Sequence, residues 1–547
     1  MTPETSTPTA TWAQWLPRTR TQRVALGVSV ASEVYFLVFF DGTWLPTVDL
    51  AWAVAVATWL LAFWRADVDP TPRLRHPFWF YGLYVAALLP FATNWRWVLA
   101  ADNLSWPLYA LEQLKVGPVK TLLSVNGADN FGYLQTNLHN VFMFVVAPTL
   151  FWHRVGKITV GLLALSAVYS VFARLVAPRF GLLVAACAAT TSIVLVYTYA
   201  SVPFVDGIAS GYALLAIGLW VRRSPASQQA WLLLGFLSGF MLFLTPNGWF
   251  MALCVWGWLG VQVLWRRWHL SYLVLAGVTG LIVGLPMLIQ WSHGTGGQLF
   301  SLVGNAGLTV PKVLRFLHEA AFMPFASEVD NSGAFGPQLP IGFRWLFIPG
   351  ILITPLFPRR FPGARFILGL YVLHVVVLAF TQGPYAGVSV KRAMFLIPMA
   401  AYFVFLPYHH YLRTLPVILP VIALWAGLGV RDLVMDMKPG RTGYTFLDGI
   451  VEAHQRFSDT RVCVLVSGED RAASFAPGSL IDQLYAVTPQ VLRVTDVHEP
   501  SCGDVLCYDP GEETLDLEAL GYRKVEMLNT TELRCGRRSP PGDGSHR

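Results

Sequence analysis

Residues 180–223 read FGLLVAACAATTSIVLVYTYASVPFVDGIASGYALLAIGLWVRR, two apolar runs separated by one carboxylate, Asp206. The runs approach the length of about 17 to 25 residues that crosses the hydrocarbon layer of a bilayer. Similar runs recur from Val24 to Val430, about thirteen in all, and 54% of the 547 residues are hydrophobic while 13% are charged. This composition lies outside the range of soluble chains. We therefore predict an all-α polytopic membrane protein with about thirteen transmembrane helices.

The arginines predict the orientation of these spans, because Lys and Arg gather on the cytoplasmic side. The short connections at 41–48, 200–206 and 246–247 carry neither residue and are expected outside. Residues 1–23 lack the apolar core and cleavage site of a signal peptide and are expected to be a cytoplasmic tail. The arginines assigned to the inner side are Arg18, Arg20, Arg23, Arg65, Arg73, Arg75, Arg174, Arg179, Arg222, Arg223, Arg266, Arg267, Arg359, Arg360, Arg365 and Arg413.

Within the transmembrane domain, residues 24–430, two long outer loops are expected at 94–157 and 292–342. The first includes Asn140 to Trp152, which is apolar but too short to span and is predicted to lie along the outer interface as an amphipathic helix. The second includes Val310 to Met323, which has amphipathic helical spacing and carries Glu319 as a candidate substrate-binding residue. An ordinary interfacial helix is the alternative for that segment.

Residues 431–547 are expected to form a small α/β domain on the outer side of the inner or plasma membrane. Phe446 to Phe457 has helical spacing, and strand-like runs are Val462 to Val466, Val491 to Val497 and Val505 to Tyr508. Disulfides are predicted, because an even number of cysteines in an oxidising compartment favours them, and Cys502 with Cys507 is the preferred pair. A zinc site is the alternative. The four cysteines are Cys463, Cys502, Cys507 and Cys535.

Two carboxylates at span boundaries, Asp102 and Asp206, are expected on the same outer side. A carboxylate beside lipid is costly unless it serves a pathway, a partner or a reaction. Either residue could instead cap the helix that follows it. Because both face one compartment, we interpret them as candidates for a common site, with Arg96 close to Asp102 in sequence.

Lys391 and Arg392 run against the charge bias, because they precede the span Ala393 to Leu406 on the outer side. An anion such as a phosphate explains a basic pair there. Contact with lipid headgroups or with an acidic loop residue is the alternative. Carboxylates and a basic pair on one face fit the transfer of a group from a lipid phosphate to a hydroxyl, with a carboxylate as general base.

By pattern, residues 94–410 resemble the membrane-embedded GT-C glycosyltransferases, in the branch of protein O-mannosyltransferases and the lipid A aminoarabinose transferase. The motifs that carry the resemblance are Asp102-Asn103 in the first large outer loop, His139 at the head of an interfacial helix, Arg174 and Gly181, Asp206 at the end of Ser201 to Asp206, and Arg392 before a late span. The chain departs from the family at Asn103, which replaces an acid, and at Pro246, which replaces a Lys.

The resemblance implies an inverting transferase that uses a polyprenyl-phosphate sugar and a lipid, glycan or protein acceptor. It implies Asp102 as the base, Asp206 as the second acidic residue, and Asn103 and His139 as candidate substrate-binding residues. Some relatives bind a divalent metal near the acidic residues, so Asp102 and Asp206 are also candidate metal ligands.

Two other classes of function remain open from the sequence. A transporter or lipid flippase would carry ionisable groups inside the membrane, and Glu33 in the first span is such a group. A non-catalytic scaffold would leave Asp102, Asp206 and Arg392 without a shared purpose. Nucleic acid is not an expected partner, because the pI of about 9.1 reflects arginines of the inner connections.

Overall fold

The computed structural model describes most of the helical part of the chain and the strands of the C-terminal part. The described residues are 16–40, 46–65, 74–92, 133–191, 205–244, 247–266, 270–292, 309–325, 338–361, 363–381, 394–409, 453, 456–457, 462–466, 490–493, 504–508, 516–525 and 534–538.

The described chain is mostly helical. Its α-helices are α1 (Arg20–Phe39), α2 (Pro46–Phe63), α3 (Phe78–Ala92), α5 (Tyr133–Val145), α6 (Leu150–Leu175), α7 (Pro178–Ala189), α9 (Val205–Arg223), α10 (Gln228–Phe240), α11 (Asn247–Arg266), α12 (Leu270–Gln290), α14 (Val310–Phe322), α15 (Phe343–Ile353), α16 (Ala364–Thr381) and α18 (Leu396–Phe405). Short 3-10 turns follow at η2 (Met241–Phe243), η4 (Met323–Phe325) and η5 (Thr354–Leu356).

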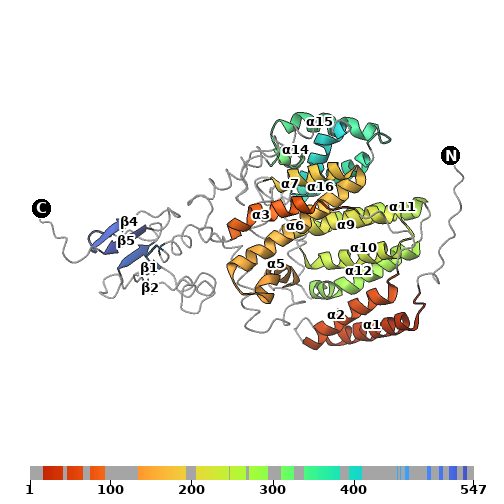
Figure 1. Cartoon of the computed structure of the whole chain (residues 1–547), viewed down its shortest axis with the longest axis horizontal. Helices are drawn as coiled ribbons and strands as arrows, with labels where there is room; N and C mark the ends of the chain where they lie inside the picture. The colour runs from red at the N-terminus through yellow and green to blue at the C-terminus, as the bar shows by residue number, and fades with distance from the viewer. Residues whose placement is uncertain are drawn as a thin grey trace.

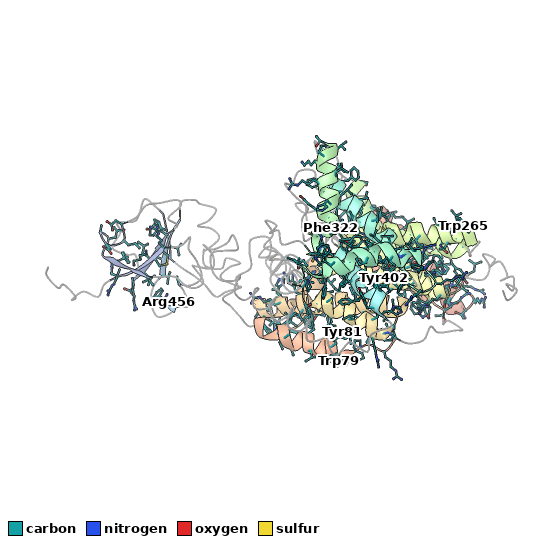
Figure 2. The ribbon with its side chains drawn as sticks, turned by 90° about the horizontal axis from the view of Figure 1, so that it is seen from above. Trp79, Tyr81, Trp265, Phe322, Tyr402 and Arg456 are labelled. Atoms are coloured by element: carbon teal, nitrogen blue, oxygen red, sulfur yellow. A yellow bond between two sulfur atoms is a disulfide. The ribbon has the colours of Figure 1, made fainter. Side chains whose placement is uncertain are left out.

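Five of these helices are long and apolar enough to cross a membrane, and further apolar helices of 10–17 residues accompany them in the described part. The five are Arg20–Phe39, Phe151–Leu175, Val205–Arg223, Gly248–Trp265 and Leu270–Gln290. Large apolar side chains cover the outside of the helical body, and Figure 2 shows Trp79 and Trp265 there, with 62% and 84% of their surface exposed. The chain is an integral membrane protein, and the number of about thirteen spans stays a prediction.

The helical body is built around α6, which packs against α3, α5, α7 and α9 (Figure 1). Tyr402 of α18 is buried in the middle of this body, where its ring meets Phe172 of α6 and Phe180 of α7 (Figure 2). Further along the chain, α10 packs between α9 and α12.

The hairpin of α1 and α2 is attached to α12 by hydrogen bonds inside the apolar region. Pro286 lacks the N–H that would bond to the carbonyl of Ile282 one turn earlier in α12. Trp52 Nε1 of α2 donates to the carbonyls of Ile282 and Val283, at 3.2 Å each. Trp59 Nε1 donates to Thr279 Oγ1 at 2.9 Å. The first two helices are therefore an integral part of the helical body.

The C-terminal strands form one five-stranded sheet in the order β2-β1-β3-β5-β4. Strands β1 (Val462–Val466), β2 (Gln490–Arg493) and β3 (Val505–Tyr508) are parallel, whereas β5 (Arg534–Arg538) runs antiparallel to β3 and to β4 (Tyr522–Val525). This confirms a small C-terminal sheet; β1 and β3 have the predicted bounds, and β4 and β5 were not predicted. Of the predicted helix, only Ala453, Arg456 and Phe457 are described.

The preferred disulfide pair was wrong. Cys507 bonds to Cys535, not to Cys502, and the two lie directly opposite each other on β3 and β5 with their Cα atoms 4.1 Å apart. The sequence pattern did not indicate β5. Cys535, which the sheet register places opposite Cys507, was therefore not recognised as its disulfide partner. Cys463 is buried in β1, and Cys502 lies outside the described residues.

The first outer loop also differs from its predicted form. The predicted helix from Asn140 to Trp152 does not form as one element, because α5 ends at Val145 and α6 starts at Leu150. Residues 150–157 therefore belong to the long apolar helix rather than to a loop, and they bring their charged side chains into the helical body.

Candidate functional site

Among the described residues, buried polar side chains are concentrated where α5 meets the first turns of α6. Five side chains gather there, none more than 1% exposed, and we refer to them as the α5–α6 cluster. They are His139, Asn140, His153, Arg154 and Lys157. His153 and Lys157 are four residues apart and Arg154 and Lys157 three, so they share one side of α6. Burying basic groups costs several kcal/mol unless counter-charges or hydrogen bonds compensate.

The hydrogen bonds of the cluster tie three elements together. His153 Nδ1 lies 2.5 Å from Asn140 Oδ1 of α5, and Arg154 Nη1 donates to the carbonyl of Ala92, the last residue of α3, at 3.5 Å. Both ring nitrogens of His139 and Nε2 of His153 are buried without a hydrogen-bond partner among the described residues. The cluster therefore offers hydrogen-bonding groups that the described protein does not use.

The electrostatics of His139 follow from its surroundings. Burial, with a smaller contribution from the positive charge of Lys157, lowers the pKa of His139 well below its ordinary value of 6.5. A ring with this pKa is neutral at pH 7 and presents one N–H and one lone pair. It can donate one hydrogen bond to an anion.

Gly156 allows α5 to approach α6 this closely. A Cβ atom at this position would collide with the backbone carbonyl of His139, so the two helices meet backbone to backbone. Any larger residue would push α5 away and separate His139 from Lys157.

Of the two carboxylates predicted to share a site, Asp206 is described, and it lies in the first turn of α9 with 1% of its surface exposed. Its Oδ1 accepts a hydrogen bond from the backbone N–H of Gly207 at 2.8 Å. A negative charge at this position is favoured by the helix dipole.

Helices α6 and α9 run in the same direction, which puts Asp206 at the cluster end of α6. Arg223 Nη2 donates to the carbonyl of Arg174 at the C-terminal ends of both helices, and the rings of Phe172 and Tyr212 lie 6.2 Å apart. Counting back along both helices from these contacts, Asp206 lies level with the part of α6 between residues 157 and 166. At 1.5 Å per residue, its level is within about 14 Å of Lys157.

The described chain after the basic pair Lys391-Arg392 also docks on α9. Phe395 stacks on Tyr212 with ring centroids 6.0 Å apart, and its carbonyl accepts a hydrogen bond from the Tyr212 hydroxyl at 2.7 Å. Tyr212 follows Asp206 by less than two helical turns. Phe395 also stacks on His374 of α16, with ring centroids 5.6 Å apart.

The predicted site residues divide into two groups. Asp206, His139 and Glu319 are described, whereas Arg96, Asp102, Asn103, Lys391 and Arg392 lie outside the described residues. Asp206 and His139 lie at the same end of the helical body, the end at which α6 and α9 begin. Glu319 forms an ion pair within α14, because Arg315 Nε donates to its Oε1 at 2.6 Å.

Four members of the cluster were not among the predicted site residues: Asn140, His153, Arg154 and Lys157. Their signal was present, because the stretch HRVGK at residues 153–157 has two charged residues and a histidine at helical spacing, at the head of an apolar run. Assigning these residues to a loop hid the fact that they share one helix face.

A divalent metal held by Asp102 and Asp206 stays a prediction, because Asp102 lies outside the described residues. In the described ranges no group of three or more His, Cys, Asp or Glu side chains could hold a metal ion. Arg154 and Lys157 would also repel a cation at the cluster end of α6. The described part of this end is therefore better suited to an anion.

The comparisons with known proteins found matches among solved structures. No family model matches the chain, and no curated protein matches it significantly. Two crystal structures of ArnT from Cupriavidus metallidurans, an aminoarabinose transferase of the GT-C fold, are structural neighbours of this chain. The apo structure has 14% sequence identity, and the match covers 85% of this chain and 99% of that chain. The structure bound to undecaprenyl phosphate has 13% identity, and the match covers 85% of this chain and 100% of that chain. The TM-score is 0.38 for both.

Proposed function

We propose that this protein transfers a sugar from a polyprenyl-phosphate donor to a hydroxyl acceptor at the outer face of the membrane, with inversion at the anomeric carbon. The observation that carries the proposal is the α5–α6 cluster: buried basic groups and unused histidine nitrogens at the same end of the helical body as Asp206. Such a set of side chains suits the binding of an anion close to a reacting carboxylate. It lies on helices that carry the motifs resembling the GT-C glycosyltransferases.

The reaction would proceed as one displacement. The acceptor oxygen forms a bond to the anomeric carbon from the side opposite the phosphate, and the bond between that carbon and the phosphate oxygen breaks. The electron pair of the broken bond leaves with the phosphate, and the acceptor proton passes to a carboxylate. Asp102 is proposed as this base, and Asp206 as the second acidic residue.

The departing phosphate gains negative charge during this step, so fixed positive groups stabilise the transition state. We assign that role to Arg154 and Lys157, with a hydrogen bond from His139, in addition to the proposed pair Lys391 and Arg392. Arginine can bind two phosphate oxygens at once, whereas lysine supplies a point charge. In sequence, Asp102 follows Ala92, the last residue of α3, by ten residues, and the Ala92 carbonyl is hydrogen bonded to Arg154. Asp102 therefore belongs to a segment that begins beside the cluster.

The orientation belongs to the same proposal. With residues 1–23 in the cytoplasm, the cluster, Asp206 and the C-terminal sheet all face the outer compartment of the inner or plasma membrane. The disulfide between Cys507 and Cys535 supports this side, because disulfides persist in oxidising compartments.

The test uses membranes that contain the full chain and a panel of radiolabelled polyprenyl-phosphate sugars. Transfer to a hydroxyl acceptor is expected with the parent, and strongly reduced transfer with Asp102→Asn and with Arg392→Ala. Undiminished transfer in Asp102→Asn would remove that residue as the base. No transfer with any sugar of the panel would contradict the function.

A transporter or lipid flippase is the second candidate, because of one observation in α1. Both carboxylate oxygens of Glu33 are buried without a hydrogen-bond partner among the described residues, and an intramembrane acid is often part of a transport pathway. In proteoliposomes, Glu33→Gln is expected to leave sugar transfer unchanged. Vectorial lipid movement that requires Glu33, without transfer, would favour the transporter.

A further inference from the structure

The last two strands of the sheet carry a concentration of positive charge. Five basic residues lie on them, all exposed, and we refer to them as the β4–β5 edge. They are Arg523, Lys524, Arg534, Arg537 and Arg538. In the part of the chain that the structure describes, none of the five forms an ion pair, whereas Arg315 and Glu319 do. Among the described residues, therefore, no ion pair neutralises the charge of this edge.

Sheet architecture alone does not account for these residues. Strand β4 is at the edge of the sheet, and charged residues on an edge strand prevent unwanted strand pairing. That reason covers Arg523 and Lys524. It does not cover β5, which lies between β3 and β4. Moreover, Arg523 is the direct cross-strand partner of Arg537, and like charges in that position destabilise a sheet.

Aromatic rings orient the guanidinium groups of this region. Arg537 and Arg456 lie over the ring of Phe457, at 5.9 Å and 5.7 Å from its centroid, and Arg538 lies over Tyr522 at 5.6 Å. Figure 2 shows Arg456 beside the sheet. A guanidinium stacked on a ring keeps its N–H edge available, and that edge matches the paired oxygens of a phosphate or carboxylate.

A disulfide cross-links the strands that carry the charges. The disulfide joins Cys535 of β5 to Cys507 of β3, and Cys535 lies between Arg534 and Arg537 in the strand. The arginines of β5 therefore keep a fixed spacing relative to the sheet. Fixed positions reduce the entropy lost when an anion binds.

The charges point to both faces of the sheet, because successive strand residues alternate. Arg523 and Arg537 share one face, and Lys524, Arg534 and Arg538 share the other. A flat lipid surface can neutralise only one of these faces. A flexible chain of anionic groups can contact both by passing around the free edge of β4.

We propose that the β4–β5 edge binds a flexible polyanion, a glycan polymer with repeated phosphate or carboxylate groups, and that this polymer is the acceptor of the transferase reaction. Binding of the polyanion follows from the edge itself. Its role as acceptor rests on the proposed function.

The binding test uses the purified full chain in neutral detergent and fluorescently labelled linear polyphosphate as the probe. The variant Arg523→Ser/Arg537→Ser is compared with Arg359→Ser/Arg360→Ser. The second variant removes the same charge from two exposed arginines outside the sheet. Fluorescence anisotropy is expected to show binding weakened at least about tenfold in the first and less than about twofold in the second. Equal weakening in the two variants would overturn the proposal.

Two further measurements distinguish paired recognition of an anion from simple charge attraction and from lipid binding. The variant Arg523→Lys/Arg537→Lys keeps the charge but loses the paired geometry, and we expect affinity between those of the parent and the serine variant. Vesicles of phosphatidylcholine and phosphatidylglycerol provide the lipid surface. If the serine variant loses vesicle binding but keeps polyphosphate binding, the partner is the bilayer and the proposal fails.

Folding is checked on the same samples. The serine variant removes a repulsive pair, so its Tm is expected to stay equal or rise; a fall in Tm together with lost binding would assign the arginines to structure. Sugar transfer to a small neutral alcohol is expected to continue in the serine variant, whereas transfer to an anionic glycan polymer decreases at least about tenfold. Normal polyphosphate binding without any transfer would contradict the proposed function alone.

Discussion

The α5–α6 cluster and the β4–β5 edge use the same residue types in opposite environments. Arg154 and Lys157 are no more than 1% exposed inside a helical body, whereas Arg523 and Arg537 are exposed on a sheet. A buried charge interacts strongly with one well-placed partner, because little water screens it. Exposed charges are screened and act as a group. The first arrangement suits a reacting phosphate and the second suits the capture of a long anionic chain.

The largest effect is expected from Lys157→Met, which removes the lysine amino group from the buried cluster. Sugar transfer per folded protein is expected to fall about 100- to 1,000-fold, as for the loss of one preorganised group that stabilises transition-state charge. Lys312→Met on α14 is the matched control and is expected to change transfer less than about twofold. Equal rates for the parent and Lys157→Met would show that the cluster is structural.

The second-largest effect is expected from removing the disulfide that links the β4–β5 edge to β3. Cys507→Ser/Cys535→Ser opens a link with a sequence separation of 28, and the C-terminal sheet is expected to lose about 3 to 4 kcal/mol of stability. Urea unfolding followed by limited proteolysis of the sheet measures this loss. Cys502→Ser is the control and should leave the midpoint unchanged; a comparable loss there would reinstate the discarded pairing.

A smaller effect is expected from Gly156→Ala, which forces α5 away from α6. The change is expected to cost about 1 to 3 kcal/mol through overpacking and to lower transfer with it. Gly257→Ala in α11 is the matched control, because an added Cβ there meets no atom within 4 Å. Thermal unfolding in detergent compares the two variants. A destabilised Gly257→Ala with an unaffected Gly156→Ala would contradict the close contact.

The smallest effect concerns pH. Because the folded-state pKa of His139 lies below its unfolded value of about 6.5, the unfolded chain binds more protons in acid. The contribution of His139 is therefore complete above about pH 6.5 and is lost as the pH falls toward its lowered pKa. His139→Gln is expected to lose less Tm than the parent between about pH 7 and pH 5. An identical pH profile would show that His139 is not buried in its neutral form.

Sequence patterns were sufficient where hydrophobicity decides structure. Strands β1 and β3 were predicted because VCVLV and VLCY are apolar and partly β-branched. Strand β5 has the sequence RCGRR, whose position is set by its neighbours and its disulfide rather than by propensity, and it was missed. His139 was found through a motif, but Arg154 and Lys157 were not, because their burial depends on the backbone contact at Gly156.

Whether Asp206 and the α5–α6 cluster act in one site is decided by a double-mutant cycle on sugar transfer. Rates are measured for the parent, Asp206→Asn, Lys157→Met and the double variant, each corrected for folded protein. Residues that serve the same step are expected to be non-additive, with a coupling of at least about 1 kcal/mol. Effects that add to within about 0.3 to 0.5 kcal/mol would show that the two groups act independently and would contradict the shared site.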